Sequence, residues 1–268
     1  MTNLHVRWHS ELLGRDTEFR VLIPAHGAPP FATLYLLHSL GDNSSAWLEK
    51  SCLTRAVQSL PLLVVMPDGQ RGFFTNNDDG PPYARHIGEE LVPLIDRMFR
   101  TIPERHARAI GGASMGGYGA LRVGLEYSSL FCSVHSQAGS LDRNIVFARD
   151  PEKRSPVIRS RPESFIDEMR RVFGEAPTNT PHDVLYQALE ARRRGTLPAF
   201  RFDCGTEDYL IHGNRAFHKD LVTSGIPHVY HEYPGSHGWS YCDAHFPEAL
   251  HFHCQNLGIT APQPASSS

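Results

Sequence analysis

The sequence predicts an α/β protein in which a mostly parallel β-sheet carries helices on both faces. From residue 32 onward, apolar runs of strand length alternate with longer amphipathic stretches, which is the order of strand–helix repeats. The runs 33–37 and 62–66 are apolar throughout, as expected of strands covered on both faces. With 268 residues, 40% of them hydrophobic, the chain is large enough to form one domain with a full core.

Two runs precede these repeats, 6–13 and 19–24, and the short turn 14–16 joins them. A turn of this length can connect only antiparallel neighbours. We therefore expect an antiparallel hairpin at one edge of the sheet.

The middle of the chain predicts the central elements. Residues 83–100 place their apolar side chains on one helical stripe, and we expect Pro93 to kink this helix. A strand over 106–113 runs directly into a helix over 116–127, and a further strand covers 131–138. The second half resumes the sheet, and its expected elements are strands at 199–204 and 229–233 and helices at 214–224 and 241–256.

Between these halves, residues 141–197 are polar, rich in arginine and interrupted by proline, and we interpret them as an inserted cap. The expected domain covers residues 1–259. The tail 260–268 consists mainly of Pro, Ala and Ser, and we expect it to be disordered.

The segment Gly112-Ala113-Ser114-Met115-Gly116 matches the pattern GxSxG at the predicted strand-to-helix turn. A nucleophilic serine at such a turn needs a strained backbone, and flanking glycines let the strand and helix approach closely. The alternative is an ordinary glycine-rich turn. Its position between a strand and a helix favours Ser114 as a nucleophile.

A serine hydroxyl becomes a good nucleophile when a histidine accepts its proton and a carboxylate orients that histidine. In α/β-hydrolases both follow the serine, in loops after later strands. Asp208 lies in the polar loop after the strand 199–204, and we choose it as the acid over Glu207 and Asp203.

The base is expected in the loop that follows the strand 229–233. His237 lies there between Gly235 and Gly238, which free its backbone to bring the imidazole over the serine. The other histidines in this part of the chain lie within or beside the strand or in the last helix, where packing or surface roles are more usual; they are His228, His231 and His245.

An oxyanion intermediate needs two N–H donors. One is expected from Met115, directly after the nucleophile, and the other from Ser39 or Leu40, with Leu40 favoured, in the loop after the strand 33–37. We interpret His38 as a structural residue that supports this loop.

These residues resemble the esterase D and tributyrin esterase family, which includes S-formylglutathione hydrolases, feruloyl and acetylxylan esterases, and mycolyltransferase antigens. The resemblance spans about residues 15–255, and its most specific carriers are GASMGGYGA at 112–120 and the step from His237 to Trp239. It implies the α/β-hydrolase fold, with Ser114 as nucleophile, Asp208 as acid and His237 as base. It also implies an oxyanion hole formed by the amides of Leu40 and Met115.

The chain departs from this family at Ser39, where glycine is usual, and a side chain there would narrow the acyl pocket or shift the first oxyanion donor. Phe73 and Phe74 resemble the family's aromatic wall, and Trp47 and Trp239 are candidates to line the site beside them. The alternative is that these aromatic residues belong to the core.

The combined hypothesis is a serine esterase that hydrolyses short-chain carboxylic esters through an acyl-enzyme, without a metal or organic cofactor. Within the family, the alternatives are a thioesterase acting on S-formylglutathione, a feruloyl or acetyl carbohydrate esterase, and an acyltransferase. A thioesterase would need a basic pocket, for which the candidates are Arg71, Arg85, Arg143 and Arg154. The alternative from a different class is a non-catalytic binding protein on the same scaffold.

Composition points to small-molecule ester substrates. A formal net charge of −3 offers no basic surface for nucleic acid or an anionic membrane, and no uninterrupted apolar stretch is long enough to span one. Without a secretory leader, we expect a soluble cytoplasmic protein whose five cysteines are reduced and mostly buried, and self-association into a homo-oligomer stays open. A metal site at His251, His253 and Cys254 is disfavoured by their spread around a helix.

Overall fold

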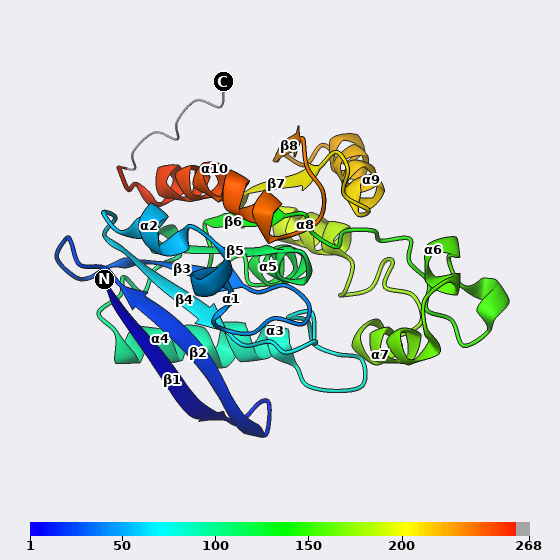
Figure 1. Ribbon diagram of the computed structural model, residues 1–268, viewed down its shortest axis with the longest axis horizontal. Helices are drawn as coiled ribbons and strands as arrows, with labels where there is room; N and C mark the ends of the chain where they lie inside the picture. The colour runs from blue at the N-terminus through cyan, green and yellow to red at the C-terminus, as the bar shows by residue number, and fades with distance from the viewer. Residues whose placement is uncertain (261–268) are drawn as a thin grey trace.

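The computed structural model describes residues 1–260, and its centre is one eight-stranded sheet in the order β1-β2-β4-β3-β5-β6-β7-β8 (Figure 1). The first two strands form the expected antiparallel hairpin at one edge, and β2 is also antiparallel to β4. All other neighbours pair in parallel, which confirms the α/β class with a mostly parallel sheet. The strands are β1 (Thr2–Ser10), β2 (Arg15–Ile23), β3 (Ala32–Leu37), β4 (Leu62–Pro67), β5 (Arg108–Ala113), β6 (Ser133–Gln137), β7 (Ala199–Gly205) and β8 (Val229–Tyr233).

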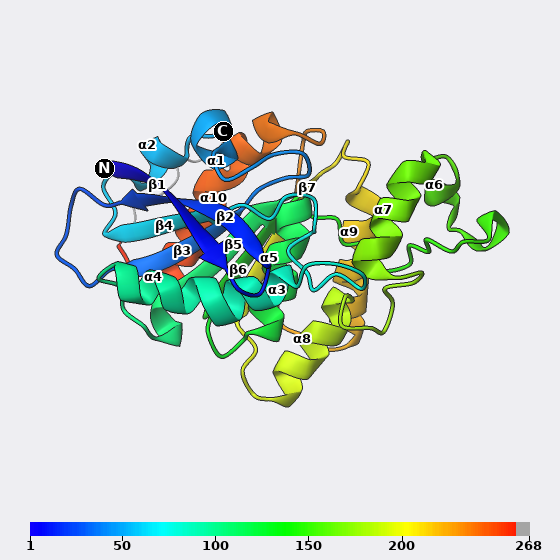
Figure 2. The same ribbon diagram turned by 90° about the horizontal axis from the view of Figure 1, so that it is seen from below.

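Helices cover both faces of this sheet because its central strands are apolar on both sides. In β3, Tyr35 and Leu37 face the core beneath one set of helices, while Leu34 and Leu36 face the other. The first set is α3 (Tyr83–Arg85), α4 (Val92–Met98), α5 (Met115–Glu126), α8 (Val184–Arg193) and α9 (Ile211–Thr223). The second set is α1 (Ala46–Lys50), α2 (Leu53–Val57) and α10 (Trp239–Leu257), which Figure 2 shows together on one face of the sheet.

The predicted helix 83–100 is interrupted by a π-helical stretch, His86–Leu91, between α3 and α4. The Val92 amide donates to the Ile87 carbonyl, five residues earlier. Pro93 follows at once and has no amide hydrogen, so the wide turn changes the hydrogen-bond register just where a donor is missing. A π-turn on the N-terminal side of the proline therefore interrupts the predicted helix.

Other boundaries shift by a few residues. The hairpin turn lies at 11–14, not 14–16, because the Gly14 amide donates to the Glu11 carbonyl at 3.2 Å and Ser10 pairs with Arg15. The strand expected from 106 begins at Arg108, since Arg105–Ala107 forms a 3₁₀ turn.

Residues 138–198, named here the β6–β7 insertion, carry α6 (Pro156–Arg159), α7 (Glu163–Phe173), α8 and a 3₁₀ turn at Pro151–Lys153. Figures 1 and 2 both show α6 and α7 lying beyond the end of the sheet. The polar composition of this stretch does not extend to all of its inner surface, although Arg154, Asp183 and Gln187 are buried. On α7 the apolar Ile166, Met169 and Val172 are buried, so the insertion has an apolar inner face.

The predicted tail largely lies outside the described residues. Within residues 1–260, no helix combines the length and apolar character needed to cross a bilayer. All five cysteines are free, and Cys204, Cys242 and Cys254 are buried.

A pair of buried histidines joins β6 to α10. The Nδ1 of His135 lies 2.6 Å from Nε2 of His253, whose Nδ1 lies 2.7 Å from Oγ of Ser133. Desolvation, helped by the charge of Arg201, lowers the pKa of His253 to about 3, and desolvation also lowers the pKa of His135. Both imidazoles are therefore neutral in the folded protein at neutral pH.

This pair predicts a loss of stability in mild acid. The unfolded chain takes up a proton on His253 below about pH 6.5 while the folded chain does not, so the free energy of unfolding falls as the pH drops from there toward 3. Urea unfolding at pH 7 and pH 5 should show His253→Gln losing about 2 kcal/mol less than the parent over this interval. His251→Gln, outside the pair, is the control. Equal losses in all three proteins would contradict the assignment.

Candidate active site

Ser114 lies at the tight turn between β5 and α5, with a backbone conformation that side chains rarely adopt, φ 55° and ψ −114°. Its flanking glycines make this turn sterically possible. A Cβ on Gly112 would lie 2.3 Å from the Gly116 carbonyl oxygen, and one on Gly116 would lie 2.2 Å from the Leu37 carbonyl oxygen. The GxSxG pattern thus reflects a close packing of α5 against β5 and the end of β3.

Three side chains from separate loops meet at this turn. The Oγ of Ser114 lies 2.9 Å from Nε2 of His237, and Nδ1 of His237 lies 2.7 Å from Oδ2 of Asp208. The Asp208 carboxylate is buried, and its Oδ1 accepts the Leu210 amide at 2.8 Å. A carboxylate held in this way fixes the orientation of the imidazole, and the imidazole can accept the serine proton.

The loops after β7 and β8 bind each other, which sets the distance between acid and base. The Thr206 amide donates to Tyr233 O at 2.8 Å, and the Glu207 amide donates to Gly235 O at 3.0 Å. A Cβ on Gly205 would lie 2.2 Å from this same Gly235 oxygen. The neighbouring loops therefore pack backbone against backbone.

The alternative acids and bases lie elsewhere. Asp203 is fully buried and binds Arg201 at 3.0 Å and the Tyr241 hydroxyl at 2.9 Å. His228 stacks on Phe202, and His245 stacks on Tyr233. None of these side chains contacts Ser114 in the described structure, and Glu207 contributes only a backbone bond.

Two amides are available beside the serine. Leu40 and Met115 both line the cavity that contains Ser114, and in the described part of the chain neither amide donates a hydrogen bond to another protein group. The Leu40 loop is held by its own turn, in which the Asp42 amide donates to Ser39 O at 3.1 Å. His38 ties this loop to the segment after β4, since its Nε2 accepts a hydrogen bond from the Gly69 amide at 3.0 Å.

The structure corrects several expected substrate contacts. The Ser39 hydroxyl donates to Ala113 O at 3.2 Å, so this side chain is turned toward β5 and does not narrow the cavity. Trp47 is 1% exposed and donates to Leu37 O at 2.9 Å. Trp239 packs edge-on against Trp47 and donates to Asp42 at 2.9 Å. Phe74 is a core residue that a Cβ on Gly69 or Gly119 would strike.

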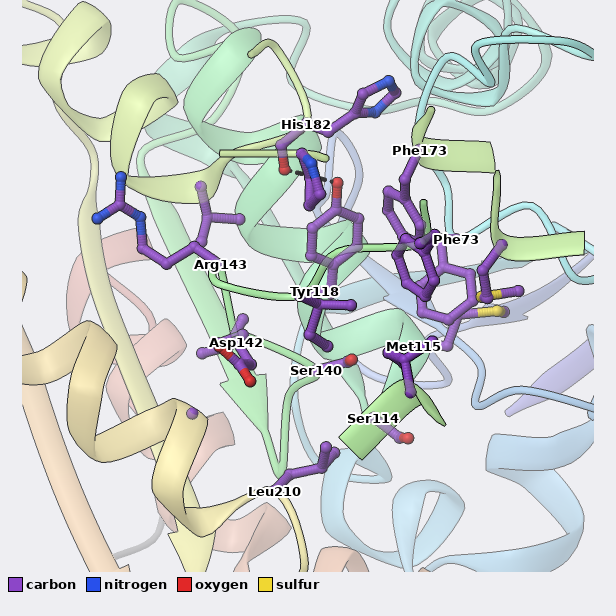
Figure 3. A pocket seen from close by; sticks show the side chains of 18 of the residues that line it. Phe73, Ser114, Met115, Tyr118, Ser140, Asp142, Arg143, Phe173, His182 and Leu210 are labelled. Atoms are coloured by element: carbon purple, nitrogen blue, oxygen red, sulfur yellow. Dashed lines mark hydrogen bonds between the residues drawn. The ribbon is translucent and has the colours of Figure 1, made fainter. Parts of the chain in front are cut away.

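Phe73 does line the site, in a cavity of about 370 Å³ that extends from Ser114 beneath the β6–β7 insertion. Figure 3 shows Ser114 and Met115 at one end of it, with Phe73 and Phe173 close together. Their ring centroids are 5.0 Å apart, and Tyr118 packs on both. Sequence reasoning did not single out the contribution of the insertion, whose cavity residues are chiefly apolar: Leu141, Ile145, Phe147, Ile158, Phe165, Met169 and Phe173.

The arginines considered for a basic pocket all have carboxylate partners. Arg71 pairs with Glu168, Arg85 with Glu89, Arg154 with Glu163, and Arg143 with both Asp183 and Asp220. Of these four, Arg143 alone lines the cavity, and its charge is already matched. A search of residues 1–260 finds no group of three or more side chains arranged to hold a metal ion.

Comparisons with known proteins show the family of this chain. A family model described as "Putative esterase" matches residues 10–253. An acetyl esterase of Caldicellulosiruptor saccharolyticus is 25% identical over 264 residues, which cover 93% of this chain and 97% of the relative.

Solved structures share the fold. The fluorophosphonate-binding serine hydrolase FphF of Staphylococcus aureus has a TM-score of 0.79 at 21% identity, covering 94% of this chain and 98% of its own. The S-formylglutathione hydrolase FrmB of the same organism has a TM-score of 0.76 at 22% identity, with the same coverage. The fold is therefore that of the α/β-hydrolases. The chain belongs to this esterase family and is a carboxylic ester hydrolase.

The packing at the serine turn gives a first test of the site. In Gly116→Ala, the new methyl group meets the Leu37 carbonyl, directly before the loop that carries the Leu40 amide. Since backbone must move to relieve the contact, we expect at least a tenfold fall in kcat on a p-nitrophenyl ester together with a lower thermal midpoint. Ser39→Gly touches the same loop without adding atoms and should change kcat less than about threefold. Parental kcat in Gly116→Ala would refute the proposed constraint.

Proposed function

We propose that Ser114 is the nucleophile of this esterase, with His237 as the general base and Asp208 as the carboxylate that orients it. The observation that carries the proposal is the continuous chain of hydrogen bonds from Ser114 Oγ through His237 to Asp208, at 2.9 and 2.7 Å. As Ser114 attacks the ester carbonyl, its proton passes to Nε2 of His237. The same nitrogen then protonates the departing alcohol, which leaves an acyl group on Ser114. Water attacks this acyl-enzyme while His237 accepts its proton, and the acid is released as Ser114 regains a proton from His237.

The charge that develops on the carbonyl oxygen is stabilised by the amides of Leu40 and Met115. Both are fixed before substrate arrives, one by the turn at Ser39–Asp42 and the other by the start of α5. Donors that need no rearrangement stabilise the transition state more than solvent does, which is the usual basis of an oxyanion hole.

The substrate is a small ester with an apolar acyl group of short to medium length. A cavity of about 370 Å³ lies near the lower end of the range for small-molecule sites. Phe73 and Phe173 give it an apolar wall, and the β6–β7 insertion closes it on the side away from the sheet. We propose that residues 141–197 act as a cap within a single domain, and that this cap limits the acyl length.

The carboxylate partners of the four arginines leave no support for a glutathione-binding pocket at those positions. The acetyl esterase among the relatives is consistent with a simple short-chain ester instead. A cytoplasmic location and self-association remain predictions from the sequence.

Substitution of the three residues tests their roles. Ser114→Ala and His237→Ala should each lower kcat on p-nitrophenyl butyrate by roughly four to six orders of magnitude, and Asp208→Asn by about four. Ser140→Ala removes another cavity serine that makes no bond to His237 and should change kcat less than tenfold. Initial rates of p-nitrophenol release would measure kcat for each variant. Substantial activity in Ser114→Ala would refute the mechanism.

The cap is tested by acyl selectivity. Met169 lies on the cavity side of α7, so Met169→Trp should lower kcat/KM for p-nitrophenyl octanoate at least tenfold relative to acetate. Arg171→Trp, which adds the same ring on the exposed side of the helix, is the control. An unchanged ratio of octanoate to acetate in Met169→Trp would show that α7 does not limit the acyl group.

A further inference from the structure

Among the described residues, one arginine of the cavity lining forms no ion pair with a carboxylate. Arg161 lines the cavity, and within residues 1–260 its guanidinium forms no ion pair. Every arginine considered above is paired, and Arg143, the other arginine of the lining, is held by two aspartates. Arg161 therefore differs from its neighbours in offering an unused positive charge to whatever occupies the cavity.

A backbone hydrogen bond, the following proline and one ring contact restrict the conformation of Arg161. It lies in the short connection between α6 and α7, where its amide donates to Ile158 O at 3.0 Å and Pro162 restricts its backbone. Its guanidinium carbon is 5.8 Å from the ring centroid of Phe165, within the range of a cation–π contact. The ring and the proline limit the directions in which the side chain can point.

Arg161 lines the same cavity as Tyr209, a residue that contacts His237. Tyr209 packs against the His237 ring with centroids 4.7 Å apart. Burial and the charge of Asp208 raise the pKa of the Tyr209 phenol, and the nearby Arg161 guanidinium opposes that rise. Because His237 protonates the leaving alcohol, we expect a substrate group near Tyr209 and Arg161 to belong to the alcohol portion.

We infer that Arg161 selects esters whose alcohol portion carries a negatively charged group such as a carboxylate. This inference rests on the proposed function, because it assumes that the ester is cleaved at Ser114. A guanidinium binds a carboxylate through two parallel hydrogen bonds, and because Arg161 is exposed, solvent moderates the strength of that contact. The apolar wall at Phe73 and Phe173 then receives the uncharged acyl group.

Asp142 is the other charged side chain of the lining without an ion pair in the described residues, and its Oδ1 accepts the Asn144 amide at 3.0 Å. It lies beside Gly213 at the start of α9, since a Cβ on Gly213 would be 2.9 Å from the Asp142 Cβ. A carboxylate there repels a substrate anion, which favours binding of that anion at Arg161 over binding at the α9 side of the cavity.

The test compares a charged ester, 4-acetoxybenzoate, with its neutral methyl ester, and measures acetate release so that only cleavage of the acetyl ester is counted. Arg161→Ala should lower kcat/KM for 4-acetoxybenzoate about tenfold and that for the methyl ester less than twofold. Arg161→Lys, which keeps the charge but cannot form both parallel hydrogen bonds, should recover only part of the loss. Arg171→Ala removes an exposed arginine outside the cavity and should leave both values unchanged.

An equal effect of Arg161→Ala on both esters, or no effect on either, would overturn the inference. Ser114→Ala measured on the same two esters separates this failure from failure of the proposed function. If Ser114→Ala abolishes both activities while Arg161→Ala does not distinguish the esters, the nucleophile stands and the charge selection falls. Arg161→Gln, which removes the charge but is closer in shape to arginine, separates the loss of charge from the loss of packing on Phe165 in Arg161→Ala.

Discussion

The close approach of α5 to β5 and to the end of β3 is the constraint on which the rest of the site depends. Only glycine at positions 112 and 116 allows it, because a methyl group at either would enter a backbone carbonyl. This approach holds Ser114 in its strained conformation and brings the amides of Leu40 and Met115 to the same cavity. The proposed nucleophile and the proposed oxyanion donors are thus positioned by one steric condition and not by separate interactions.

The remaining parts of the site are brought to this turn by the parallel sheet. The loops after β7 and β8 start at neighbouring strand ends and bind each other through backbone hydrogen bonds, so Asp208 and His237 reach the serine as one unit. The β6–β7 insertion adds the apolar wall opposite. Rigid packing holds the proposed reacting groups in the sheet loops, while the insertion provides the surfaces that distinguish substrates.

Sequence reasoning predicted what local pattern and chain order determine. The strand-to-helix GxSxG and the acid-then-base order identified three side chains that the structure brings within hydrogen-bonding distance. It failed where the outcome depends on tertiary packing. Trp47 and Phe74 are aromatic residues near the site in sequence, yet their side chains fill the core. The arginine-rich insertion is polar in composition, but apolar residues of α7 face inward. Its Arg143 and Arg154 pair with acids, whereas Arg161 has no ion pair within residues 1–260, and the sequence does not show this difference.

If its surroundings activate Ser114, a covalent serine reagent should label this residue selectively. A fluorophosphonate reacts with an activated serine and forms a stable adduct, which intact-mass and peptide mass spectrometry locate. We expect one adduct per chain, on the peptide containing Ser114, and strongly slowed labelling in His237→Ala. Labelling at another residue, or no labelling of the folded protein at all, would contradict it.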